Sequence, residues 1–358
     1  MALTDYSKLF VSTLEDYING GVLEDVVFTK TPFLEYAQRN LIEKKPAAET
    51  FRVNIRTGRN NNFQGYGPLQ TWTFQPDKGY SRAQYDRKEH VITAVISGQE
   101  EEYNTGDVAL FDVVKETTDK LTMSLEEDLE KRLIRNHGQT SDQSKEAHGL
   151  ELLVGDSLSV YTKVGNIDAI DAPWWQSIVK RPGYDFPVID WENIFTAWTW
   201  PTDTNTTQNP YDAADTVNWQ ALTLDMIDQM ISYLNLGGED PKLCLTTPDI
   251  KQAMVRLLKA NGYMVQRDTS GKMVGATRDN VVYRNIVFVD SIRVNRGDMY
   301  FLNDECIKIR VHPNKWMVTR PWISPYDQDA KYMAVYAWFQ MYSTDRRGLG
   351  KIVKVAHK

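Results

Sequence analysis

Few side chains in this sequence could do chemistry, and their spacing does not match a known type of site. Three consecutive glutamates, Glu100 to Glu102, could bind a metal or serve as an acid/base cluster. Consecutive residues on a strand point to alternate faces, however, so we expect a solvated run of charges. The histidines are His90, His137, His148, His312 and His357, and they do not show the spacing of metal ligands.

Motifs of catalysis and cofactor binding are also missing. The chain has no G-x-x-x-x-G-K-[ST], no H-E-x-x-H, no C-x-x-C and no G-x-S-x-G. The Gly-x-Gly pairs that begin at Gly65 and Gly348 lack the third glycine of a dinucleotide-binding loop. Cys244 and Cys306 each lie in an apolar run, which predicts two small buried residues. We therefore expect no enzyme activity, no cofactor and no metal.

The composition is that of a folded protein. The chain has 358 residues, of which 42% are hydrophobic and 25% charged, with a formal charge of -7. This acidity argues against a dedicated nucleic-acid binder, although it is compatible with a place next to packaged DNA. The first residues lack the basic and apolar regions of a signal peptide, and the longest apolar run, Tyr332 to Met341, is too short to span a bilayer. We expect a soluble, cytoplasmic protein.

The element that dominates the pattern is a long amphipathic helix between Asn104 and Gly138. One stripe is apolar and consists of Leu110, Val114, Leu121, Leu125, Leu129 and Leu133. The other faces are predicted to carry the charges, among them Asp119, Glu126, Glu127, Glu130 and Lys131. At ~1.5 Å per residue such a helix is roughly 45 Å long. A rigid helix of this length suggests assembly and not a catalytic pocket.

A strand-rich excursion, from about Thr50 to Gln99, precedes this helix. Phe51, Val53 and Ile55 alternate with polar residues, which predicts a half-exposed strand. The chain returns through a second apolar alternation from His90 to Ile96. Because a two-stranded excursion has little core of its own, we expect a neighbouring chain to stabilise it.

The remaining segments indicate an arm followed by a mixed domain. Residues 1–45 are predicted to form an extended arm with short amphipathic pieces. Helices are expected from Trp219 to Leu234 and after Thr247, and Lys242 to Thr246 reads as a buried strand. The tail is strand-rich, with strands predicted at 286–289, 299–302, 307–311, 316–319 and 331–342. Ten tryptophans are spread along the chain as core or interface anchors.

The order of these elements, together with several local patterns, resembles the tailed-phage major capsid protein family with the Hong Kong 97-type fold. The patterns are the step from Ile96-Ser97 to Asp107, Gly149 to Leu152, Gly165 to Asp168 ahead of Trp174-Trp175, Thr246 to Asp249, Tyr300 to Asn303 and Asp345 to Gly350. No single pattern is specific, but the ordered set covers nearly the whole chain.

The resemblance implies an α+β fold with four parts. These are an N-terminal arm (1–45), an E-loop (46–103), a peripheral domain (104–200 and 315–358, with a spine helix over 105–137) and an axial domain (201–314). It also implies pentamers and hexamers that tile an icosahedral shell around double-stranded DNA, with assembly in the cytoplasm of a bacterial host. The arm begins almost at Met1, so a separate scaffolding protein is expected unless the sequence is already processed. A portal and a decoration protein are further implied partners.

Six residues are candidates for contacts between subunits: Trp72, Phe74, Lys78, Tyr80, Arg346 and Arg347. Some members of the family crosslink through a loop lysine, and Lys78 would be the residue for it here. A solvated lysine in a turn is the alternative interpretation of Lys78.

Three other functions remain open. The first is an encapsulin-like nanocompartment shell of the same fold, which encloses an enzyme. The second is a tail-tube or decoration protein, and the third is a carbohydrate-binding module suggested only by the tryptophans. The long helix argues against the second and third. Particle size and contents would separate the first from a phage capsid.

Overall fold

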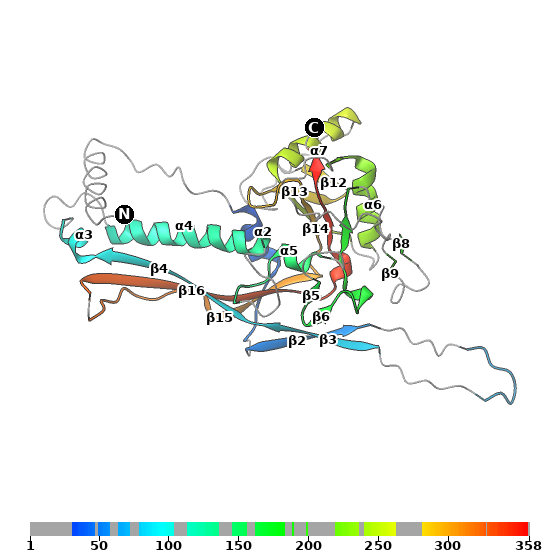
Figure 1. The fold of residues 1–358 in the computed structure, drawn as a ribbon, viewed down its shortest axis with the longest axis horizontal. Coiled ribbons are helices and arrows are strands. Elements are labelled where there is room, and N and C mark those ends of the chain that lie inside the picture. The colour runs from blue at the N-terminus through cyan, green and yellow to red at the C-terminus, as the bar shows by residue number, and fades with distance from the viewer. Residues whose placement is uncertain are drawn as a thin grey trace. The chain divides into compact units, whose positions relative to one another are not determined.

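The structure is a computed structural model that describes residues 31–46, 49–57, 64–71, 79–103, 113–135, 145–155, 162–182, 188–189, 198–199, 219–235, 240–262, 281–326 and 328–356. The chain forms two compact units (Figure 1). Unit 1 comprises Met1–Thr31, His90–Leu129 and Asn314–Ala337, and unit 2 comprises Pro32–Glu89, Glu130–Pro313 and Trp338–Lys358. Among the described helices, none is long and apolar enough to cross a membrane.

A six-stranded mixed sheet forms the centre of unit 2. Its strands, in spatial order, are β12 (Val281–Tyr283), β13 (Ile286–Asp290), β11 (Leu243–Thr246), β14 (Met299–Leu302), β17 (Gly350–Ile352) and β7 (Ile178–Lys180). The pairs β11–β13 and β17–β7 are parallel, and the others are antiparallel. All four residues of β11 are buried, which explains its unbroken Leu-Cys-Leu-Thr sequence, since both faces of the strand are covered.

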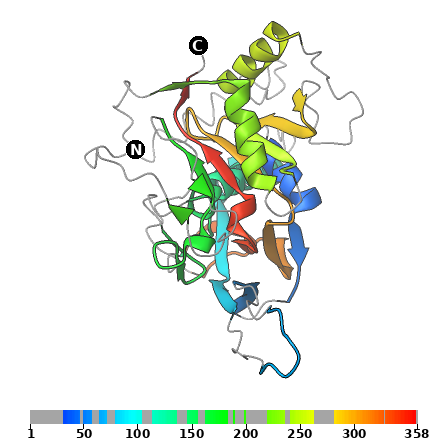
Figure 2. The ribbon, with the colours of Figure 1, turned by 90° about the vertical axis from the view of Figure 1, so that its right-hand side faces the viewer.

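Two amphipathic helices, α6 (Leu224–Leu234) and α7 (Pro248–Ala260), cover one face of this sheet (Figures 1 and 2). The shared core includes Met226, Ile227, Met230, Ile231, Ile250, Met254 and Leu258 from the helices and Cys244, Phe288 and Phe301 from the strands. Thr223 caps α6, because its hydroxyl accepts a hydrogen bond from the Met226 N–H at 3.2 Å. Pro248 is the first residue of α7, as predicted.

Residues 32–44 belong to the body of unit 2, although we expected them to form part of an extended N-terminal arm. Helix α2 (Pro32–Asn40) buries Phe33, Leu34, Tyr36 and Ala37 and contacts β13. Strand β1 (Ile42–Lys44) pairs in parallel with β15 (Ile307–Thr319). The apolar face that the sequence shows over this stretch needs a core, and the sheet provides it. Residues 1–30 lie outside the described residues.

A two-stranded hairpin in unit 2 consists of β2 (Thr50–Arg56) and β3 (Tyr80–Asp86). We expected the return strand over 90–96. Those residues instead belong to β4 (Lys88–Ser97), an edge strand of a second sheet with the order β1-β15-β16-β4. Both segments alternate apolar and polar residues, and alternation marks a strand without identifying its partner.

Unit 1 contains β4 from His90 onward, the end of β15 from Asn314 onward, and β16 (Ala330–Ser343) as far as Ala337. It also contains most of helix α4 (Val113–Ile134). The predicted strands at 307–311 and 316–319 form one strand, β15. The Gly98 N–H donates to the Asp329 carbonyl at 2.9 Å and joins the end of β4 to the start of β16.

Helix α4 confirms the predicted apolar stripe over its described length. Leu121, Leu125, Leu129 and Leu133 are all buried. The helix ends at Ile134, before the predicted end at 137, and Leu110 and Gly138 lie outside the described residues. The placement of Glu130 on the charged outer face is wrong, because this side chain is fully buried.

Shorter elements connect these parts. They are α3 (Gly98–Tyr103), α5 (Leu150–Leu153), β5 (Lys163–Val164), β6 (Ile167–Asp168), η1 (Pro173–Trp175), β8 (Val188–Ile189), β9 (Trp198–Thr199), β10 (Gln220–Ala221), η3 (Arg346–Gly348) and β18 (Val355–Ala356).

The structure groups the segments differently from the predicted domains. Strands β7 and β17 come from segments assigned to a peripheral domain, yet they share a sheet with β11 to β14 of the expected axial domain. A strand of three residues gives little periodic signal, so its sheet partners cannot be read from the sequence.

Candidate assembly surfaces

One of the two faces of the hairpin β2–β3 packs against the rest of unit 2. Phe51 lies opposite Tyr85 in the hairpin, and both rings pack against Tyr342, with centroids 5.1 Å and 5.8 Å from it. The Tyr85 hydroxyl donates to the Ser343 carbonyl at 3.1 Å, and the Gln84 N–H donates to the Gly165 carbonyl at 2.9 Å. The base of the hairpin is therefore held in place by its own chain.

Gly165 is required at this contact. It lies in the turn between β5 and β6, where both Gly165 and Asn166 have positive φ angles. A Cβ on Gly165 would come within 2.9 Å of the Tyr85 ring and of the Ala83 side chain. The short β5–β6 hairpin thus supports the long one.

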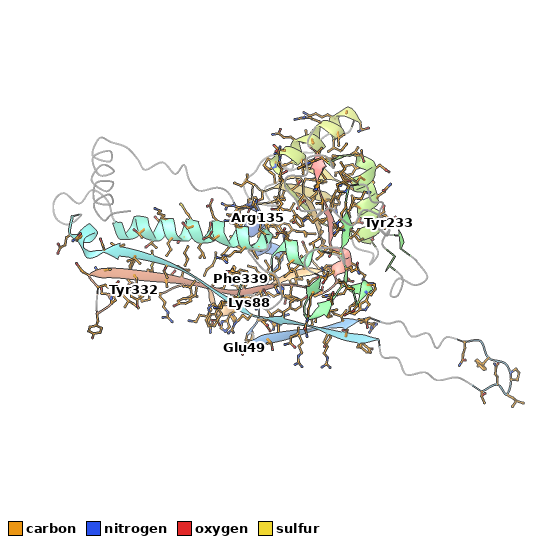
Figure 3. The ribbon with its side chains drawn as sticks, in the orientation of Figure 1. Glu49, Lys88, Arg135, Tyr233, Tyr332 and Phe339 are labelled. Atoms are coloured by element: carbon orange, nitrogen blue, oxygen red, sulfur yellow. The ribbon has the colours of Figure 1, made fainter. Side chains whose placement is uncertain are left out.

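The outward face of the hairpin carries arginines and one tyrosine. The register places Arg52 opposite Gln84, Arg82 opposite Asn54 and Arg56 opposite Tyr80, so these side chains share one face. Arg52, Arg82 and Arg56 are all exposed, and Tyr80 is 69% exposed. In Figure 3 the labelled Glu49 marks the start of this hairpin and Lys88 the start of β4.

Beyond the paired strands, residues 64–71 of the loop carry two large exposed side chains. Tyr66 is 70% exposed and Leu69 is fully exposed, next to a turn in which the Gln70 N–H donates to the Gly67 carbonyl. Of the predicted contact residues, Tyr80 is thus placed on the outward face. Trp72, Phe74 and Lys78 lie outside the described residues.

The two predicted arginines near the C-terminus differ sharply. Arg346 is fully buried, and its guanidinium donates to the carbonyls of Leu153, Trp175 and Gly155 at 2.8 to 2.9 Å. It joins three segments of its own chain, so this geometry favours an internal role over a contact between subunits. Arg347 is partly exposed and forms a bidentate pair with Asp345.

The buried Glu130 was missed by sequence reasoning. Its carboxylate accepts hydrogen bonds from the Ser291 hydroxyl at 2.6 Å and from the Leu34 N–H at 3.3 Å. It therefore caps the start of α2 and ties this helix to α4 and to the end of β13. Burial raises the pKa of Glu130, against the lowering effects of these hydrogen bonds and of Arg293.

A second exposed apolar surface lies in unit 1. Val91 and Val95 of β4 and Tyr332 of β16 are exposed, and Ile323 and Tyr326 are exposed in the connection between β15 and β16. The connection is held by paired hydrogen bonds between Ile323 and Tyr332, the latter labelled in Figure 3. Large exposed side chains on a strand and a turn that backbone hydrogen bonds fix in place are typical of a binding surface.

The residues considered for chemistry do not come together. Glu100 to Glu102 lie on the short helix α3 and not on a strand. Among the described residues, no group of three or more His, Cys, Asp or Glu could hold a metal ion. Cys244 is buried, which raises the pKa of its thiol, whereas Cys306 is only partly buried.

A protein-family model described as SU10 major capsid protein matches residues 92–330. No curated protein matches the chain. The chain is similar in structure to the capsid asymmetric unit of cyanophage A-1(L), with 15% identity, a TM-score of 0.65, and coverage of 93% of this chain and 95% of that chain.

Two further solved structures are similar over most of their length. The holo-SrpI encapsulin complex from Synechococcus elongatus PCC 7942 has 13% identity and a TM-score of 0.57, covering 94% of this chain and 93% of that chain. The capsid of a native GTA particle has 10% identity and the same TM-score and coverage. Because the sequence identities are this low, the similarities establish the fold alone. The structural similarity confirms the predicted α+β fold of the Hong Kong 97 type.

Proposed function

Because the chain belongs to the SU10 major capsid protein family, we propose that its copies assemble into the closed shell of a virion, with the hairpin of one copy packed on the next. The chain is a structural protein and not an enzyme, as its family and fold indicate. Beyond the family assignment, we propose which surfaces form the contacts between copies and what the shell contains.

The outward face of the hairpin is the single observation that carries the proposed mode of assembly. One face of the hairpin is fixed to its own chain through Phe51 and Tyr85, while Tyr80 and three arginines are left in solvent. Tyrosine and arginine are enriched in protein interfaces and supply much of their binding energy. A hairpin held rigidly at its base and exposed beyond it is suited to engage a second copy.

The proposed shell consists of pentamers and hexamers around double-stranded DNA. The family assignment and the fold shared with phage capsids support this proposal. A separate scaffolding protein, a portal and a decoration protein are the proposed partners, and the host cytoplasm is the proposed place of assembly. With a formal charge of -7, a subunit supplies little counterion release, so its contact with DNA should be weak.

Electron microscopy of the purified protein tests this proposal, with and without a co-expressed scaffolding protein. We expect closed particles or capsomers of uniform size. A monomer that stays monodisperse at high concentration and physiological salt, even with scaffold supplied, would contradict it.

The encapsulin similarity makes a nanocompartment the second candidate, since the holo-SrpI complex shares the fold at a similar TM-score. Shell contents decide between them. Nuclease-protected double-stranded DNA in particles from infected cells supports the phage capsid, whereas a single co-purifying cargo enzyme supports the nanocompartment.

A further inference from the structure

A lysine and an aspartate are buried against each other in the six-stranded sheet of unit 2. Nζ of Lys351 lies 2.8 Å from Oδ2 of Asp298, and the two side chains are only 1% and 5% exposed. Lys351 is the central residue of β17, and Asp298 directly precedes the neighbouring strand β14. Lysine and aspartate are seldom buried completely, because the cost of removing both charges from water offsets much of their attraction.

The pair lies on the face of the sheet that α6 and α7 do not cover. Phe301 of β14 and Ile352 of β17 belong to the core beneath these helices. Successive residues of a strand point to opposite faces, so Lys351 and its cross-strand partner Tyr300 point the other way. This face of the sheet thus carries a buried polar group on each of the two strands.

Two further side chains complete a polar cluster around the ion pair. The ring of Tyr300 is 1% exposed, its centroid lies 4.8 Å from Nζ of Lys351, and its hydroxyl is hydrogen-bonded to this ammonium group. The carboxylate of Glu151, which accepts a hydrogen bond from the Asn295 side chain at 3.2 Å, adds a second negative charge. An amine, a carboxyl group, a hydroxyl and a second carboxylate therefore meet inside one unit.

Burial favours the uncharged forms of the two partners. An ammonium ion is not a nucleophile and a carboxylate is a poor electrophile, so the pair is unreactive while both groups are charged. Burial is the main cause that raises the pKa of Asp298; Lys351 opposes this effect and Glu151 adds to it. Transfer of one proton from Lys351 to Asp298 gives a neutral amine in contact with a carboxylic acid.

The contact also removes the entropic barrier to a reaction between the two groups. Reacting groups that are held together in a suitable orientation behave as if present at effective concentrations of ~10⁵–10⁸ M. Here the folded sheet fixes both backbones, because Asp298 and Lys351 flank the same pair of hydrogen-bonded strands. Neither partner has to leave its place for the nitrogen to reach the carboxyl carbon.

We propose that Lys351 and Asp298 form an intramolecular isopeptide bond in the folded subunit. Nζ of Lys351 attacks Cγ of the protonated Asp298 carboxyl group, an amide bond forms, and the bond from Cγ to the hydroxyl oxygen breaks. The Tyr300 hydroxyl, which contacts the amine, passes a proton from Nζ to the leaving hydroxyl group. In total the ion pair loses one water molecule, nothing is oxidised or reduced, and no co-reactant is needed.

This bond joins two strands of a single subunit, and it forms once in each chain. It differs from the crosslink between subunits that was considered for Lys78, because both of its partners are buried in the same unit. It closes residues 298–351 into a covalent ring, which restricts the unfolded chain and holds β17 in the sheet. It requires folding but not assembly, so it is independent of the proposed function.

Mass spectrometry of the denatured wild-type subunit tests the proposal. We expect an intact mass that is lower by one water than the mass calculated from the sequence. Trypsin should release a branched peptide in which residues 297–308 are joined to residues 348–354, because the enzyme does not cleave after an acylated lysine. Fragmentation of this peptide should place the bond at Asp298 and not at Asp304 or Glu305.

Two variants and an internal control sharpen the test. Lys351→Met with Asp298→Asn removes the amine but keeps an oxygen that can accept a hydrogen bond, and its mass should equal the calculated one. Tyr300→Phe keeps the ring and should slow bond formation at least about tenfold after refolding, since it removes the proton carrier. Lys251 pairs with Asp290, whose side chain is 31% exposed, and trypsin should cleave after Lys251 as usual.

A wild-type chain of the calculated mass that trypsin cleaves after Lys351 would overturn the proposal and leave Lys351 and Asp298 as a buried ion pair. A loss of water that maps to other residues, or that persists in the Lys351→Met and Asp298→Asn variant, would also overturn it. An unchanged rate in Tyr300→Phe would overturn the proton transfer through this hydroxyl. None of these outcomes depends on shell formation, which tests the proposed function separately.

Discussion

Arg346 shows how one side chain can hold several segments together. Three of its N–H groups donate to backbone carbonyls of α5, of the residues after it and of η1. Lysine has a single ammonium group and cannot reach three carbonyls in this planar arrangement. Arg346→Lys should break one or two of these buried, charge-assisted hydrogen bonds, at about 1–3 kcal/mol each. Urea unfolding of unassembled subunits measures this loss.

The neighbouring Arg347→Lys variant is the control for this comparison. Arg347 is partly exposed and forms an ion pair with Asp345. Its replacement should change the free energy of unfolding by less than about 1 kcal/mol. Equal losses in the two variants would show that burial of Arg346 does not determine its contribution.

The buried carboxyl group of Glu130 predicts how the stability of the protein depends on pH. Burial raises the folded-state pKa of Glu130 above its ordinary value of 4.5. The folded protein therefore holds this proton more tightly than the unfolded chain does, so ionisation costs stability. Its contribution is fully present below pH 4.5 and is lost as the pH rises through the folded pKa. Glu130→Gln should remove this loss, and its stability relative to wild type should rise between pH 4.5 and 8 in urea titrations.

A second variant separates charge from hydrogen bonding at Glu130. Glu130→Ala also removes the acceptor of the Leu34 N–H and should be less stable than Glu130→Gln by about 1–3 kcal/mol across the same pH range. A stability difference between Glu130→Gln and wild type that does not change with pH would contradict the assignment of a raised pKa.

Single residues were the hardest to predict from sequence. Glu130 lies off the apolar stripe of α4, and helical periodicity gives no sign that a second surface meets the helix near its C-terminal end. Arg346 was identified as notable within Asp345 to Gly350, but its partners are backbone carbonyls 171 to 193 residues away. Sequence alone carries no signal for such contacts.

Helix α4 allows a test of the apolar stripe at the scale of an element. Leu125 is 6% exposed and Met123, two residues earlier, is 43% exposed. Leu125→Asp buries an unpaired carboxylate, which costs several kcal/mol and should abolish shell formation. Met123→Asp places the same group in solvent and should cost about 1 kcal/mol or less. Circular dichroism and assembly yield of the two variants are the measurements, and normal shells from Leu125→Asp would show that the stripe is misassigned.

Elements were predicted well where the pattern was long or capped. Helices α6 and α7 and strands β11, β13, β14 and β16 lie close to where periodicity and Thr247-Pro248 placed them. The errors concern pairing. The alternation at 90–96 was assigned to the hairpin, whereas β3 at 80–86 is the partner of β2 and places Tyr85 opposite Phe51, with their rings stacked.

At the scale of the whole molecule, function depends on surfaces that are incomplete in one copy. The resemblance to capsid proteins came from the order of elements, and no single motif is specific enough to show it. Trp72, Phe74 and Lys78 stay predictions, since they lie outside the described residues. The acidic total of the chain conceals an uneven distribution of charge, with +3 over residues 49–87 and -8 over residues 98–129.

Hydrogen exchange of the hairpin tests the role of these surfaces in assembly. Among the described strands of one subunit, β2 and β3 pair with each other alone, and the described contacts anchor them near Phe51 and Tyr85, at the end away from Arg56 and Tyr80. The amides at that unanchored end should exchange readily through local opening. In a shell, the second copy covers this end, and exchange should slow by at least about tenfold, which corresponds to a change of ~1.4 kcal/mol in opening free energy. Strand β11, buried on both faces in every state, is the internal control and should be equally protected in subunits and shells. Equal exchange at the hairpin in both states would mean that its outward face stays in solvent after assembly, and the contact between copies would then have to be sought on the exposed strands of unit 1.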